Sequence, residues 1–527
     1  MQNRHRTASF AIRSRPGREE PRAGRYTSPV IRVPLLIAFL TLCVPLLAAS
    51  PGRAEEPMWT GSRIAEARTQ TLLKTLRAAD EHGLDPAWYG VDQIEQALKS
   101  SADAARTEQM IGEAFAAYAS DVSTGRVNAN SIDPDISIEQ RKVKRADLLK
   151  EATDAPDFGA WLANLPPKGD YPALQKALAM WRLKRAASTY TPLPTGDALK
   201  PGMIDPRVPT LRKRLAELEL AVPAPADAPE TYDDALAVTV KAYQQTKGLT
   251  VDGVIGANTT RSLNTSLDDR IEQIVANLER RRWLPEDLGH RYIFVNTGDY
   301  SMVFVNDGKR VFESQVIVGT PKHPTPEIQS TMYGFQTNPY WTVPQSISGD
   351  EYLPLLRRDP YALASQGFKI FASWSDNDSE IDPATVDWNS INPKAFPYRV
   401  RQEPGATNAL GYIFFPFQNK YGIYMHDTAS RWLFTEGSRN FSHGCIRLQN
   451  PLDFVEKVFA GRASFDRARV QRAIDGGEQV HYSFPESVKL YVTYRTVTAA
   501  PDGTPTFRDD VYGRDRKVVA AMGRPRS

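Results

Sequence analysis

The stretch RYIFVNTGDYSMVFVNDGKRVFESQVIVG, residues 291–319, marks a change in the hydrophobic period of the sequence. Apolar and polar residues alternate in RYIFVN and in YSMVFVN, and the pair Asp307-Gly308 forms a turn before KRVFESQVIVG. A period of two interrupted by a tight turn is typical of antiparallel strands. The stretch therefore predicts that a β-rich domain begins at residue 291.

Strand-like runs continue through GYIFFPF, KYGIYMH and VKLYVTYRTVT, which ends at Thr498. Within 345–400 the alternation gives way to Pro, Asp, Ser, Asn and Trp, which indicates an insertion. An insertion of this length often serves as a lid over a catalytic loop. We expect a catalytic domain at 291–490 with a capping insertion at 345–400, followed by a C-terminal strand and tail at 491–527.

The segment FSHGCIRLQNP, residues 441–451, contains one of only two cysteines in the 527-residue chain. A cysteine becomes an effective nucleophile when an imidazole accepts its proton, and His426 is the predicted base for Cys445. In a strand, Tyr424 and His426 point to one face and Asp427 to the other, so Asp427 is not expected to orient the imidazole. A backbone carbonyl or a neighbouring group is expected to do so, with Tyr424, Ser442 and His443 as the candidates.

Two neighbours of Cys445 predict further roles. Gly444 allows a sharp turn, so that the N–H groups of Gly444 and Cys445 can face a developing oxyanion. Arg447 supplies positive charge that can lower the pKa of the thiol or hold a substrate carboxylate, although a structural salt bridge is the alternative interpretation.

A three-ligand zinc site made of His426, His443 and Cys445 is a second interpretation of the same residues. The sequence has neither a Cys-x-x-Cys pair nor a His-x-x-x-His helix in this region, so no metal or other cofactor is expected.

Upstream of the β-rich domain, residues 201–268 read as a small unit of three short helices. Leu236, Val240 and Tyr243 follow helical spacing up to Gly248, and LTVDGVIGANTTRSLN contains two tight turns. This pattern resembles the peptidoglycan-binding module of bacterial wall enzymes, with a plain helical spacer as the alternative. The matching residues are Gln244, Gly248, Leu249, Asp252, Gly253, Gly256 and Thr259. We expect a helical connector at 269–290.

The N-terminal half divides into a leader and a helical region. Residues 55–200 show helical spacing rich in Ala, Leu, Lys and Arg, which predicts a scaffold domain. Residues 1–54 contain nine of the 65 basic residues but two of the 62 acidic ones, and eight of the nine precede an apolar run at 33–49. This pattern predicts a signal peptide or an inner-membrane anchor. The remainder is slightly acidic, which disfavours nucleic acid as a partner, and in it Cys445 has no cysteine to pair with.

Together, NALGYIFFPF, IYMHDT and SHGCIRL resemble the YkuD-type catalytic domain of L,D-transpeptidases, and the wider order of domains is similar to the large periplasmic members of that family. The resemblance covers about Glu55 to Arg514. It implies a multidomain α+β fold with a helical scaffold domain, a three-helix peptidoglycan-binding-like module and a β-rich catalytic domain. It also implies peptidoglycan peptide stems and glycan as partners, and a periplasmic location.

The resemblance further implies an acyltransferase without a metal. Cys445 would be acylated by a tetrapeptide stem with release of D-alanine, the acyl group would pass to an amine of a neighbouring stem, and carbapenems would acylate the same sulfur. Two alternatives remain open. In one, water is the acceptor, and the protein is an L,D-carboxypeptidase or endopeptidase with the same Cys/His pair. In the other, the protein is a wall-binding scaffold whose catalytic domain is idle.

Overall fold

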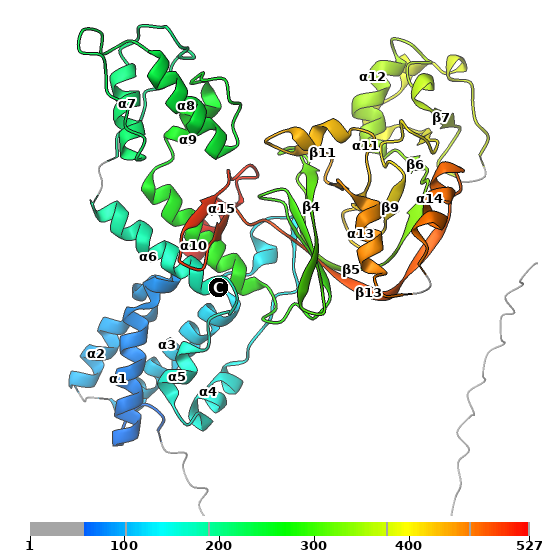
Figure 1. Ribbon diagram of the computed structural model, residues 1–527. Coiled ribbons are helices and arrows are strands. Elements are labelled where there is room, and N and C mark those ends of the chain that lie inside the picture. Colours follow the sequence, from blue (N-terminus) through cyan, green and yellow to red (C-terminus); the bar gives the residue numbers. More distant parts are fainter. Residues whose placement is uncertain (1–56, 101–102, 188–189, 376–377, 463–464, 525–527) are drawn as a thin grey trace, which may run out of the picture. The chain divides into compact units, whose positions relative to one another are not determined.

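A computed structural model describes residues 57–524 apart from 101–102, 188–189, 376–377 and 463–464 (Figure 1). The described part contains the predicted helical domains and the β-rich domain, which confirms the multidomain α+β fold class. The predicted leader at 1–54 lies outside the described residues. Among the described helices, none is both long and apolar enough to span a membrane.

The scaffold region is built mainly from helices, several of which begin at side-chain caps. Asp103 caps the longest of them by accepting a hydrogen bond from the Arg106 N–H, and Gly125 ends it with φ +96°. The region is not purely helical, because β1 (Ile136–Ser137) joins the catalytic sheet as a parallel partner of β5 (Glu327–Thr337). The helices are α1 (Arg63–Arg77), α2 (Val91–Ser100), α3 (Ala104–Thr124), α4 (Arg145–Asp154), α5 (Phe158–Ala163) and α6 (Tyr171–Ala187).

The small module contains α7 (Val208–Glu217), α8 (Asp234–Lys247) and α9 (Ala257–Leu263). As predicted, Gly248 ends α8 in the left-handed conformation. The expected start at 201 is too late, because Leu193 and Leu199 are buried in the core of the module. The expected end at 268 also needs correction, since it falls inside the connecting helix α10 (Leu267–Trp283).

The catalytic domain is a curved sheet that closes on itself through a pairing of β5 with β9. Its strands follow the order β1-β5-β13-β2-β3-β4-β12-β10-β9, and β11 pairs with β4. The predicted period-two stretch forms β2, β3 and β4. The strand bounds are β2 (Tyr292–Asn296), β3 (Ser301–Asn306), β4 (Lys309–Gly319), β9 (Ile413–Phe415), β10 (Met425–His426), β11 (Asn440–Ser442), β12 (Ile446–Leu448) and β13 (His481–Thr493).

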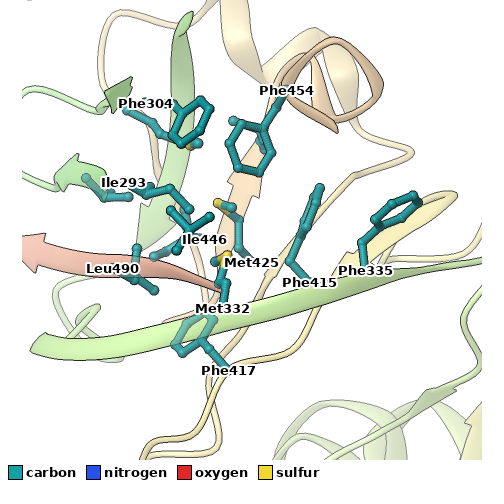
Figure 2. Close-up of a cluster of buried hydrophobic side chains, with 14 of the residues drawn as sticks. Ile293, Phe304, Met332, Phe335, Phe415, Phe417, Met425, Ile446, Phe454 and Leu490 are labelled. Carbon is teal, nitrogen blue, oxygen red and sulfur yellow. The ribbon is translucent and has the colours of Figure 1, made fainter. Parts of the chain in front are cut away.

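The core of this domain lies on the concave side of the sheet, where helices α13 (Pro451–Val458) and α14 (Arg467–Asp475) cover it. Figure 2 shows Met425 of β10, Ile446 of β12 and Phe454 of α13 in this cluster. All three are fully buried. The apolar positions of β10 and β12 therefore point inward, which leaves their alternate positions on the outer face.

The predicted capping insertion is a subdomain with its own core and a three-stranded sheet. It begins with β6 (Trp341–Thr342) and ends with β8 (Arg399–Gln402), so it extends slightly beyond the expected 345–400. Between these strands lie α11 (Gln345–Ile347), a π-helical turn (Ser348–Tyr352), α12 (Leu353–Leu356) and β7 (Phe368–Phe371).

The C-terminal prediction needs a larger correction. The boundary expected at 490 falls inside β13. The expected tail contains a hairpin of β14 (Val497–Ala499) and β15 (Pro505–Phe507), followed by helix α15 (Arg514–Met522). Val518 and Met522 of α15 are buried in the core of the scaffold region, so the chain end joins the scaffold to the catalytic domain.

Candidate active site

Strands β10 and β12 place the predicted catalytic residues on one face. The two strands run parallel, with Met425 opposite Ile446 and His426 opposite Arg447. Because Met425 and Ile446 point into the core, the alternate residues share the outer face. These residues are Tyr424, His426, Cys445 and Arg447. The structure therefore brings together the predicted nucleophile, the predicted base and a cation.

Ser442 shapes the loop that carries the cysteine. Its hydroxyl donates to the Cys445 carbonyl (2.5 Å) and accepts from the Gly444 N–H (3.1 Å), and its side chain is buried. Gly444 has φ +105°, a conformation that favours glycine. The Gly444 N–H is thus occupied within the loop, which overturns the expectation that it faces an oxyanion. Both hydrogen bonds of the Ser442 hydroxyl therefore stabilise the loop itself, and neither orients His426.

His426 is almost fully buried, and its Nδ1 lies 2.5 Å from the backbone carbonyl of Asp427. A carbonyl only accepts hydrogen bonds, so Nδ1 carries the proton and Nε2 keeps the lone pair that a base needs. The Asp427 carboxylate faces elsewhere, toward the Tyr412 N–H (2.9 Å) and the Arg431 guanidinium (2.6 Å). The orienting group is a backbone carbonyl, one of the two predicted types.

Burial keeps both the predicted nucleophile and the predicted base uncharged. Burial, together with the Arg447 cation, lowers the pKa of His426 to about 3, so the imidazole is neutral at pH 7. Burial raises the pKa of the Cys445 thiol to about 11, although hydrogen bonding to Tyr424 and the charge of Arg447 act in the opposite direction. The resting pair is therefore a thiol and a neutral imidazole.

Arg447 has no carboxylate partner within the described residues, so the salt-bridge interpretation finds no support there. Its Nε is buried without a hydrogen-bond acceptor in the same part of the chain, and burial lowers the pKa of the guanidinium. A partly buried cation without a partner is costly, and an anionic ligand would offset that cost.

His443 points away from the catalytic pair. Its Nε2 lies 2.5 Å from a carboxylate oxygen of Glu351 in the π-helical turn of the capping insertion, and its ring centroid is 4.9 Å from that of His323. His443 therefore connects the cysteine loop to the cap. In the described chain, no group of three or more His, Cys, Asp or Glu side chains is placed to hold a metal, so His426, His443 and Cys445 do not converge as ligands.

Sequence reasoning missed two residues that contact the site. The Trp341 side chain of β6 lies near the Tyr424 hydroxyl and acts to lower its pKa, whereas burial and the neighbouring Cys445 raise it. Thr325 donates from its hydroxyl to the Gly444 carbonyl (2.8 Å). Both residues stand near prolines, in WTVP and PTP, but their spacing gives no sign of contact with the cysteine loop.

A cavity of about 670 Å³ lies beside the catalytic strand and not at the thiol. It is lined by Asp427 together with residues of α13 and α14, and Cys445, His426 and Arg447 are not part of its lining. The predicted catalytic residues thus lie outside this cavity, on the outer face of β10 and β12.

Comparison with known proteins agrees with this geometry. Residues 290–465 match the model of the L,D-transpeptidase catalytic domain (YkuD), the part of the chain that holds the Cys445 and His426 face. These residues form a YkuD-type L,D-transpeptidase catalytic domain. Residues 52–178 match the scaffold domain model, and residues 205–263 match the model described as "Putative peptidoglycan binding domain".

Individual relatives of the L,D-transpeptidase domain cover part of the chain. A protein of Haemophilus influenzae described as "Putative L,D-transpeptidase" is 32% identical over 259 residues. The match spans 49% of this chain and about half (51%) of that relative. Two solved L,D-transpeptidases, from Xylanimonas cellulosilytica and Stackebrandtia nassauensis, are 15% and 14% identical, with TM-scores of 0.17 and 0.19. Each match covers 57% of this chain. It covers 98% of the Xylanimonas chain and 97% of the Stackebrandtia chain.

Proposed function

We propose that the protein is a peptidoglycan L,D-transpeptidase that works through a thioester on Cys445. The observation that carries the proposal is the shared outer face of β10 and β12, which holds Cys445, His426 and Arg447 together. A thiol, a base with a free Nε2 and an unpaired cation are the groups that acyl transfer to sulfur requires. The match to the L,D-transpeptidase catalytic domain supports the same reaction class.

In the first half-reaction, Cys445 attacks the carbonyl before the terminal D-alanine of a tetrapeptide stem. His426 accepts the thiol proton as the bond from sulfur to carbon forms, and an oxyanion develops on the carbonyl. The bond from carbon to nitrogen then breaks, and D-alanine leaves with the proton from His426. Arg447 stands beside the sulfur, where it can bind a carboxylate of the stem.

In the second half-reaction, an amine of a neighbouring stem attacks the thioester while His426 accepts its proton. The new amide forms a cross-link, and the thiol is regenerated. Water competes with the amine, and its attack would give a trimmed stem. The cap is tied to the cysteine loop through Glu351 and His443, a position from which it can exclude water during transfer.

The other domains support a role at the cell wall. We propose that the module matched at 205–263 holds glycan near the catalytic domain and that the protein acts in the periplasm. The location is proposed from the basic leader and the apolar run at 33–49, and fractionation of cells that express the full chain would test it.

The proposal is tested by incubating the full-length protein with disaccharide tetrapeptide and analysing the products by mass spectrometry. We expect a cross-linked dimer that has lost one D-alanine. Cys445→Ala should abolish it, whereas His290→Gln, which replaces an exposed histidine outside the site, should not. Shortened tripeptide alone would identify the peptidase alternative. An unchanged product pattern with Cys445→Ala would overturn catalysis through this thiol.

A further inference from the structure

Thr325 connects the loop between β4 and β5 to the cysteine loop through one buried hydroxyl. Its Oγ1 accepts from the Gly319 N–H (2.8 Å) and donates to the Gly444 carbonyl (2.8 Å), and the residue is fully buried. Thr325 does not contact the sulfur in any hydrogen bond of the described structure. Its direct hydrogen bond to the cysteine loop is the one to the Gly444 carbonyl.

The hydrogen bond to the Gly444 carbonyl sets the direction of the next amide. The Gly444 carbonyl and the Cys445 N–H belong to one planar trans peptide unit, so they point in opposite directions. Because the Gly444 carbonyl points toward Thr325, the Cys445 N–H points away from Thr325. Within the described residues this N–H has no hydrogen-bond acceptor, whereas the Gly444 N–H donates to Ser442.

We propose that Thr325 is the positioning residue that aims the Cys445 N–H at the oxyanion formed during acylation. The inference rests on the proposed function, because an oxyanion arises only if Cys445 attacks a carbonyl. Cys445 N–H then becomes the backbone donor of the oxyanion hole, in place of the pair of donors expected from the sequence. A preorganised donor of this kind stabilises the transition state without moving.

The neighbouring contacts hold Thr325 in place. A Cβ on Gly319 would lie 2.0 Å from the His323 carbonyl, so this tight approach of the loop requires glycine. The Tyr512 hydroxyl donates to the Gly319 carbonyl (2.8 Å). Thr325 is thus fixed from the strand end on one side and from the C-terminal segment on the other. A fixed hydroxyl can orient a peptide unit, whereas a mobile one cannot.

The test compares two reactions of the same sulfur. Acylation by disaccharide tetrapeptide, followed as D-alanine release in a single turnover, passes through an oxyanion. Alkylation by iodoacetamide displaces iodide at carbon and forms no oxyanion. The variants are Thr325→Val, which removes the hydroxyl at nearly constant shape, and Thr325→Ser, which restores it. Thr320→Val is the matched control, because its hydroxyl accepts from the His323 N–H in the same loop (3.2 Å).

We expect Thr325→Val to slow acylation by about 10-fold to 100-fold while alkylation stays within about twofold of the wild type. Thr325→Ser and Thr320→Val should acylate at nearly the wild-type rate. Unchanged acylation in Thr325→Val, an equal loss in both reactions, or no rescue by Thr325→Ser would each overturn the inference. Failure of the proposed function is separately visible, because the wild-type protein would then release no D-alanine.

Discussion

At the scale of single residues, the proposed catalytic pair of Cys445 and His426 is uncharged at rest. Many reactive cysteines are held as thiolates by nearby positive charge. Here burial outweighs the charge of Arg447, so that the thiol stays protonated and the imidazole stays a base. In the proposed mechanism, proton transfer must therefore accompany attack on the substrate, which limits reaction of the sulfur with other electrophiles.

The raised pKa of the thiol predicts a steep pH dependence of alkylation. The thiolate fraction of a group whose pKa is about 11 rises nearly tenfold per pH unit below that value. We expect the iodoacetamide rate of the wild type to keep rising between pH 7 and pH 10. A plateau by about pH 9 would contradict the high pKa.

Replacing Arg447 tests the effect of its charge on the pKa of Cys445, which opposes the larger effect of burial. The guanidinium favours the thiolate, so Arg447→Gln should raise the pKa of Cys445 further and slow alkylation at pH 8 by about threefold or more. Arg310→Gln, which removes an exposed cation, should leave the rate unchanged. Faster alkylation in Arg447→Gln would show that the guanidinium does not favour the thiolate.

At the scale of elements, the capping insertion contacts the cysteine loop and the outer face beside it. Glu351 bonds to His443 of the loop, and Trp341 of β6 lies near the Tyr424 hydroxyl on the outer face. The cap has its own hydrophobic core, so it can shift as a unit when these contacts break. We therefore expect the contact between Glu351 and His443 to limit the access of water to the thioester.

Glu351→Gln should weaken the contact between cap and loop and admit water to the thioester. We expect the ratio of hydrolysed to cross-linked product to rise by about twofold to fivefold, in keeping with the modest strength of a partly exposed hydrogen bond. Glu380→Gln is the matched control, since Glu380 pairs with Lys369 within the cap (3.1 Å). An equal product ratio in both variants would rule out this role of Glu351.

Local patterns explain which elements the sequence predicts. The alternation in residues 291–319 predicts β2, β3 and β4, and Gly248 predicts the end of α8, because these signals lie within one element. The Cys445 and His426 face is predictable for the same reason, since strand periodicity and one short motif define it. Thr325 is not predictable, because its bond to Gly444 joins residues 119 positions apart.

At the scale of the whole described chain, the C-terminal segment joins the scaffold region to the catalytic sheet. β1 of the scaffold pairs with β5, and α15 packs on α10 and buries Val518 and Met522 in the scaffold core. These contacts come from distant segments, so the local sequence shows only a short strand and a charged tail. The same segment supplies Tyr512, which reaches Gly319 beside the cysteine loop.

An ion pair between α10 and α15 is central to this arrangement. Arg280 and Asp515 are both buried and bonded to each other, and Asp515 also accepts from the Thr496 hydroxyl (2.7 Å). Asp515→Ala should lower the free energy of unfolding by about 3 to 5 kcal/mol, because it leaves the Arg280 cation buried without its partner. Denaturant unfolding measures this loss.

The control for that measurement is Arg467→Ala. Arg467 pairs with Asp453 and Glu456 on the surface, so its loss should cost less than about 1 kcal/mol. Equal losses in the two variants would mean that the pair between Arg280 and Asp515 does not hold the C-terminal helix in place.

The most direct test of the central claim is mass spectrometry of the protein itself after brief mixing with disaccharide tetrapeptide. We predict an adduct equal to the donor minus D-alanine, located on the peptide that contains Cys445 and absent from Cys445→Ala. Cross-linked product formed without any adduct on Cys445, or an adduct on another residue, would contradict a thioester mechanism at this site.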